Sequence, residues 1–133
     1  MAISPTRREA RERALGLVYE AEMRGVDPGA VVAEQMVLPD DYACFLVEGV
    51  AEHGEEIDAL LRKYSEHWAL ERMPVVDRTL LRLSTFELGW VTDVPPAAVI
   101  TEAVELAKQY STRDSGRFVN GLLGRIAEQL RGS

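Results

Sequence analysis

The fold is decided by residues 99–126, which carry the sequence VITEAVELAKQYSTRDSGRFVNGLLGRI. Over the first twelve positions the apolar residues fall on one side of a helical wheel and most of the polar residues on the other. After Asp114 the helical spacing returns in a second apolar stripe: Val119, Leu122, Leu123, Ile126 and Leu130. The joint between them, residues 111–114, is rich in side chains that accept backbone hydrogen bonds. The pattern therefore predicts two amphipathic helices that meet at a short capped joint.

Phe118 lies outside the apolar stripe of the second helix. At 100° per residue it stands about 100° from the centre of the stripe, beside Arg117, Gly121 and Arg125. An aromatic ring among guanidinium groups, with glycine leaving space, is typical of a platform for an unstacked nucleobase. The alternative is that the ring packs against a neighbouring element, which is the more frequent position of a phenylalanine.

The composition indicates one globular domain spanning residues 1–133. Apolar residues make up 47% and charged residues 28% of the chain, as in ordinary globular proteins. The single cysteine, Cys44, excludes an internal disulfide and favours a reducing compartment. The chain begins without an apolar leader and has no run long enough to span a membrane. These features predict a cytoplasmic protein with no membrane association.

The net charge of −7 argues against general binding to nucleic acid, for which a basic domain is expected. Any contact with RNA must come from a local cluster and should be sensitive to salt. Such a cluster lies at the start of the first helix, where Thr6 and Glu9 form a capping box and Arg7, Arg8 and Arg11 lie within one and a half turns. The helix dipole disfavours cations there. Arginine side chains, however, can bind a phosphate group through two parallel hydrogen bonds. The cluster therefore indicates either a phosphate site or a solvated face.

Helical spacing covers nearly all of the chain between breakers, and no strand alternation appears, so an all-α fold is predicted. Further helices are expected over residues 28–37, 41–53, 54–64 and 75–91. The last of these is the most apolar and should run through the middle of the fold. In its first turn Asp77 is favoured by the dipole, while Tyr19 on the first helix is either a contact residue or a half-buried rim position. The connector over residues 65–74 carries Trp68 and Leu70, which are both expected to be buried.

The sequence contains no motif that would support catalysis. His53 and His67 share no helical turn with a second metal ligand, and neither a zinc motif nor a phosphate-binding loop is present. Serine, histidine and aspartate occur without a nucleophile elbow. The sequence therefore predicts no catalytic residue, no metal site, no cofactor and no enzymatic activity.

With these residues identified, the chain resembles the NusB family of bacterial transcription antitermination factors over almost its whole length. The resemblance is carried by RREARERAL (residues 7–15), VDRTLLRLSTFEL (residues 76–88) and the opening stretch, where ITEAVELAK and RFVNGLL occur together. It implies an all-α bundle of about seven helices in two packed subdomains. It also implies joint binding of boxA RNA in ribosomal RNA leader transcripts with the ribosomal protein NusE, within the antitermination complex on RNA polymerase. Family members occur as monomers and as homodimers, so both states stay open.

The resemblance also implies roles for particular residues. RNA contacts fall on Arg7, Arg8, Arg11, Asp114, Arg117 and Phe118. Contacts with NusE fall on Tyr19 and Asp77, although from spacing alone Asp77 is a first-turn acid. Two other interpretations stay open. One is the RNA-binding domain of an rRNA cytosine methyltransferase, which would need a long cofactor domain downstream. The other is a helical protein-interaction module that binds no RNA.

Overall fold

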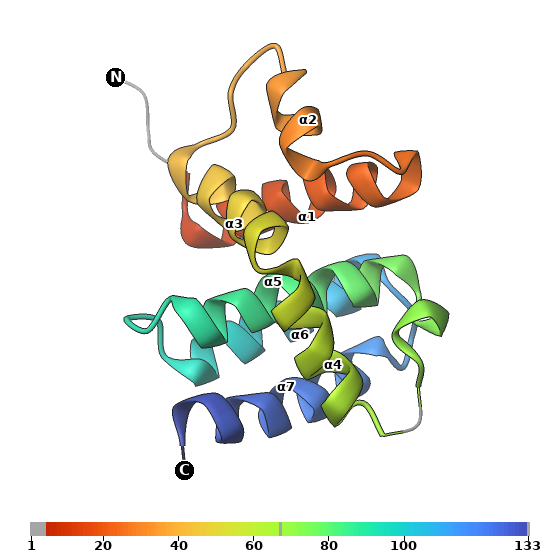
Figure 1. Ribbon diagram of the computed structural model, residues 1–133. Helices are drawn as coiled ribbons and strands as arrows, with labels where there is room; N and C mark the ends of the chain where they lie inside the picture. Colours follow the sequence, from red (N-terminus) through yellow and green to blue (C-terminus); the bar gives the residue numbers. More distant parts are fainter. Residues whose placement is uncertain (1–4, 67, 133) are drawn as a thin grey trace.

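The computed structural model describes residues 5–66 and 68–132, which form seven α-helices, one short 3-10 helix and no β-strand. The elements are α1 (Arg7–Arg24), α2 (Pro28–Ala33), α3 (Asp41–Glu52), α4 (Gly54–Tyr64), the 3-10 helix η1 (Leu70–Arg72), α5 (Val75–Trp90), α6 (Pro96–Tyr110) and α7 (Ser115–Arg131). Figure 1 shows α1, α2 and α3 grouped above α4, α5, α6 and α7. The predicted all-α bundle of about seven helices in two packed groups is confirmed.

Helix α5 lies at the centre of the fold and packs against α1, α3, α4, α6 and α7. Its leucines at 80, 81, 83 and 88 are all buried, as its apolar sequence predicts. The polar residues of α5 are also enclosed, because Asp77, Arg78 and Glu87 are buried. Each of them has partners on a neighbouring helix or connector, as buried polar groups require. Helix α5 thus supplies both the apolar centre and the polar anchors of the molecule.

The ends of α1 follow from local sequence. The Thr6 hydroxyl accepts a hydrogen bond from the Glu9 backbone N–H at 3.1 Å, and the Glu9 carboxylate accepts one from the Thr6 N–H at 3.0 Å. This is the predicted capping box. At the other end Gly25 takes the left-handed conformation with φ 67°, where a glycine is favoured.

Helix α2 is shorter than predicted and ends at Ala33 rather than near Val37. The side chain of Gln35 turns back and donates a hydrogen bond to the carbonyl of Val31 at 3.0 Å. Residues 36–38, the last of which precedes Pro39, lie on the surface without continuing the helix. A residue before proline is biased away from helical geometry, which helps to explain the early end.

Helices α3 and α5 approach closely because α3 carries a glycine at their contact. A Cβ atom on Gly49 would lie 2.1 Å from Cζ of Phe86, which is far too close for two carbon atoms that are not bonded to each other. The Phe86 ring in turn lies parallel to Trp90, with ring centroids 5.8 Å apart, and beside His53. Gly49 therefore makes room for the aromatic cluster that joins the two groups of helices.

Two sets of buried or half-buried ion pairs tie the groups of helices together. In the first, Glu87 of α5 is 2% exposed and accepts hydrogen bonds from Nε and Nη2 of Arg11, at 2.8 and 2.9 Å. The Tyr42 hydroxyl of α3 donates to the same carboxylate at 2.6 Å. Burial and the Glu87 carboxylate together raise the pKa of Tyr42 above its ordinary value. One carboxylate thus holds α1, α3 and α5.

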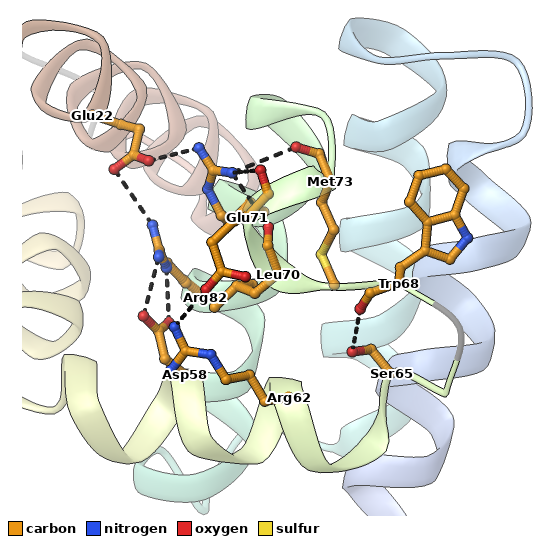
Figure 2. Close-up of polar contacts among 10 residues, drawn as sticks. Glu22, Asp58, Arg62, Ser65, Trp68, Leu70, Glu71, Met73 and Arg82 are labelled. Carbon is orange, nitrogen blue, oxygen red and sulfur yellow. Dashed lines mark hydrogen bonds and ion pairs between the residues drawn. The ribbon is translucent and has the colours of Figure 1, made fainter.

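The second set is drawn in Figure 2 and joins α1, α4, α5 and η1. Arg78 donates to Glu22 at 2.6 Å and Arg82 donates to Asp58 at 2.9 Å. Arg78 also donates to backbone carbonyls of the connector that contains η1. These contacts set the path of the connector between α4 and α5, and that path decides where Trp68 lies.

Candidate functional site

The joint between α6 and α7, residues 111–114, is held against the start of α5 by Asp77. This carboxylate is 3% exposed and accepts hydrogen bonds from the hydroxyl groups of Ser111 and Ser115, the latter at 2.9 Å. The Ser115 hydroxyl also accepts the backbone N–H of Thr112 at 3.1 Å. A buried carboxylate with two donors fixes the geometry of the loop.

Asp114 stands at the N-cap position of α7 without capping the helix through its side chain. Its carboxylate is exposed and forms no hydrogen bond or ion pair with the residues that the structure describes. The backbone N–H of Ser115, the first residue of α7, instead donates to the carbonyl of Thr112 at 3.1 Å. Asp114 is therefore available to accept hydrogen bonds from a ligand.

Phe118 is half-buried and forms one wall of a surface hollow of about 280 Å³. Trp68 and Pro74 complete the apolar side of the hollow, and Asp77 and Asp114 lie on its polar side. The rings of Phe118 and Trp68 are in contact, with centroids 6.2 Å apart and planes tilted by 55°. The partial exposure of Phe118 agrees with its place outside the apolar stripe of α7.

The prediction that Trp68 is buried is wrong, since this side chain is 51% exposed. The Ser65 hydroxyl donates to the Trp68 carbonyl at 2.9 Å. Leu70 takes the core position of the connector, where it is 1% exposed, and the indole ring stays outside. The predicted burial of Leu70 is confirmed.

Two arginines lie next to residues of this hollow in the sequence. Arg113 and Arg117 are exposed, and neither forms an ion pair within the part of the chain that the structure describes. Arg125 is different, because its Nε donates to the carbonyl of Tyr64 at 3.1 Å and ties α7 to α4. A Cβ on Gly121 would meet only the Arg125 guanidinium at 3.7 Å, so glycine is not needed there to clear the surface.

The three arginines of the predicted phosphate site on α1 lie in different environments. Arg7 stacks over the ring of Tyr42, 3.8 Å from its centroid. Arg8 is exposed and pairs with Glu102 of α6 at 2.8 Å. The Arg11 side chain is 11% exposed and committed to Glu87. A phosphate could reach Arg7 and Arg8 directly, whereas Arg11 would first have to leave a buried partner.

Tyr19 is 37% exposed and lines a second, largely apolar hollow of about 390 Å³ between α1, α5 and α6. Its other lining residues include Leu15, Val76 and Tyr110. The Tyr110 hydroxyl donates to the Glu12 carboxylate, which raises the pKa of the phenol. The two residues assigned to protein contacts thus line different hollows, since Asp77 faces the one beside Phe118.

Two further features, metal binding and membrane spanning, concern the side chains and helices of residues 5–66 and 68–132. No group of three histidine, cysteine, aspartate or glutamate side chains there could hold a metal ion. No helix of the same residues is long and apolar enough to cross a membrane. His67, considered above as a metal ligand, lies outside the described residues.

Comparison with known proteins identifies the family. The sequence model of the NusB family matches residues 8–128. The transcription antitermination protein NusB of Salinispora tropica is 50% identical over 131 residues, covering 93% of this chain and 96% of that protein. The corresponding protein of Acidothermus cellulolyticus is 47% identical over 126 residues, covering 92% of this chain and 87% of that protein.

Solved structures agree with the sequence comparison. The structure of T. maritima NusB superposes with a TM-score of 0.87 at 36% identity, covering 96% of this chain and 94% of that one. A chain in the crystal structure of antitermination factors NusB and NusE in complex with dsRNA superposes with a TM-score of 0.79 at 35% identity, covering 92% of this chain and 96% of that one. The helical order, the family match and these relatives agree, and the chain belongs to the NusB family.

Proposed function

We propose that the protein is a transcription antitermination factor that binds boxA RNA of ribosomal RNA leader transcripts together with the ribosomal protein NusE. In this role it joins the antitermination complex on RNA polymerase, acts in the cytoplasm as a single domain, and performs no catalytic step of its own. Family membership supports the activity. A chain 35% identical to this one occurs with NusE and dsRNA in a crystal structure, which supports the choice of partners.

The RNA-binding part of the proposal rests mainly on the surface around Phe118. A half-buried aromatic ring lies there beside the Asp114 carboxylate, with the unpaired guanidinium groups of Arg113 and Arg117 nearby in sequence. Aromatic rings and arginines together are a common means of binding single-stranded RNA, because bases stack on the rings and phosphates contact the guanidinium groups. The strongly acidic chain has no need of a basic surface elsewhere if the site is local and shared with NusE.

The remaining predicted residues take different parts in this proposal. Arg7 and Arg8 are exposed and supply a second, weaker contact with phosphate. Arg11 acts mainly through the Glu87 ion pair. Tyr19 lines an apolar hollow suited to a protein contact with NusE. Asp77 positions the loop of the RNA site.

The test is the effect of Phe118→Ala on RNA affinity in the presence of NusE. Loss of one stacked base costs about 1–3 kcal/mol, so we expect about a tenfold weaker affinity for boxA RNA. The free energy of unfolding should fall by less than the roughly 3–5 kcal/mol of a fully buried phenylalanine, since this ring is only half-buried. Fluorescence anisotropy of labelled boxA RNA and thermal unfolding give the two quantities.

The matched control is Phe45→Ala, because Phe45 is a partly exposed phenylalanine on α3. This variant should keep the affinity for boxA RNA. Equal affinity of the unmodified protein for boxA and for a scrambled RNA would contradict the proposed function. Unchanged affinity in Phe118→Ala would remove Phe118 from the site.

A further inference from the structure

Trp68 is a large aromatic side chain whose exposure the fold does not require. Its neighbours in the connector, Leu70 and Met73, are 1% and 3% exposed, while Trp68 is 51% exposed. Figure 2 shows its ring pointing away from the ion pairs around Arg82 and Asp58, toward the pale blue helices. The side chain thus contributes less to the core than its size allows.

The indole ring is held in place by its surroundings. The Ser65 hydroxyl bonds the Trp68 carbonyl, and the ring rests against Phe118 at a centroid separation of 6.2 Å. With their planes tilted by 55°, the two rings form two sides of a corner. A flat ligand that stacks on one ring would meet the other ring with its edge, and aromatic groups favour both arrangements.

The charges of the hollow decide which part of a nucleic acid could enter it. Its polar side carries the carboxylates of Asp77 and Asp114, which repel a phosphate group. The cations, Arg113 and Arg117, are exposed and belong to the adjoining joint and helix. A nucleotide is therefore best accommodated with its base in the corner and its phosphate outside, near the arginines. The volume of about 280 Å³ lies just below the range of pockets for drug-sized ligands, which suits a single base.

We propose that Trp68 and Phe118 together form a pocket for one unpaired nucleobase of the bound RNA, with Trp68 as its second aromatic wall. This inference rests on the proposed function and adds a binding residue from the connector between α4 and α5. Phe118 alone would offer a one-sided platform, whereas the corner encloses the base on two sides and excludes more water. We expect the position bound by this pocket to be single-stranded, because a base that is paired and stacked in a duplex has its faces covered.

The experiment compares Trp68→Ala with Trp68→Phe. The alanine variant removes the wall and should weaken boxA RNA binding in the presence of NusE by about five- to 150-fold, the range found for loss of one base stack. The phenylalanine variant retains an aromatic face and should recover most of this affinity. Thermal unfolding and NusE affinity without RNA should stay near those of the unmodified protein in both variants, because the side chain is half exposed.

A spectroscopic measurement reports directly on the ring. The chain has two tryptophans, and Trp90 stacks on His53 with centroids 4.5 Å apart. Trp90→Phe therefore leaves Trp68 as the only tryptophan of the chain. With 5-fluorotryptophan incorporated into this variant, the single ¹⁹F resonance should shift when boxA RNA is added to the complex with NusE and stay in place with scrambled RNA.

The outcomes separate this inference from the function on which it rests. If the unmodified protein binds boxA RNA and Trp68→Ala binds it equally well, the second wall is refuted while the proposed function stands. If Trp68→Ala loses affinity for NusE in the absence of RNA, the corner holds a protein side chain and the inference is refuted. If the unmodified protein fails to distinguish boxA from scrambled RNA, the proposed function fails and the base pocket fails with it.

Discussion

At the scale of single residues, Asp77 decides the shape of the candidate site. Its negative charge in the first turn of α5 is favoured by the helix dipole. The resemblance of the chain to the NusB family implies that Asp77 contacts the partner protein NusE. In the structure Asp77 is 3% exposed, and its carboxylate accepts hydrogen bonds from the hydroxyl groups of Ser111 and Ser115. Any influence of Asp77 on partner binding therefore acts through the loop that it positions.

Replacement of Asp77 by alanine should lower the free energy of unfolding by about 1–3 kcal/mol, because the buried Ser115 hydroxyl and the half-buried Ser111 hydroxyl lose their acceptor. Urea denaturation measures this change. The control is Asp114→Ala, which removes an exposed carboxylate without a side-chain cap bond and should change stability by less than about 1 kcal/mol. Reduced NusE affinity in Asp77→Ala with unchanged stability and an unchanged loop would instead assign Asp77 to the interface.

At the scale of elements, the contact between α3 and α5 depends on a missing side chain. Glycine inside a helix is unfavourable by about 0.5–1 kcal/mol relative to alanine, yet Gly49 lies within α3 and is buried. The absence of a side chain on Gly49 leaves space for the Phe86 ring, with which a Cβ atom at position 49 would overlap. Helix propensity is here subordinate to packing between elements.

Gly49→Ala should lower the melting temperature, because overpacking costs about 1–3 kcal/mol and exceeds the gain in helix propensity. Circular dichroism at 222 nm follows the transition. Gly124→Ala on α7 is the matched control, since its Cβ would meet no atom within 4 Å. It should raise the stability by up to about 1 kcal/mol. A stabilised Gly49→Ala would mean that the Phe86 ring moves aside without loss.

At the scale of the whole molecule, Glu87 connects helices from both groups. Arg11 lies 76 residues before it and Tyr42 lies 45 residues before it, and both bond its carboxylate. A buried charge is tolerated only when its partners satisfy it. The assembly of α1 and α3 on α5 is therefore coupled to one side chain.

Glu87→Ala should lower the free energy of unfolding by about 3–5 kcal/mol, because the Arg11 guanidinium keeps its buried position without a counter-ion. Guanidinium chloride denaturation gives the value. Glu102→Ala removes the acid of an exposed pair, in which the Arg8 side chain is 62% exposed, and should change stability by less than about 1 kcal/mol. Similar losses in the two variants would show that the Glu87 network is no more important than a surface pair.

The sequence by itself determined the features that depend on neighbours along the chain. The capping box of Thr6 and Glu9 and the helical periods are local, so helix type and most helix ends followed from them. Phe118 was placed outside the apolar stripe of its helix by spacing alone, and it is half-buried. The family motifs pointed to RNA and NusE, which residue spacing could not have named.

Only the tertiary structure decided which polar groups meet across the chain. The pairing of Arg11 with Glu87 and the turning of Arg125 onto Tyr64 join residues 76 and 61 positions apart, and no local pattern encodes such distances. The sequence predicts that Trp68 and Leu70 of the connector are both buried, and for Trp68 this is wrong. Trp68 is exposed, while Leu70 of the same connector fills the core position. The apolar pattern of the sequence specifies how much apolar surface is buried. The packing of the helices against one another decides which apolar side chains are buried and which stay exposed and can bind a ligand.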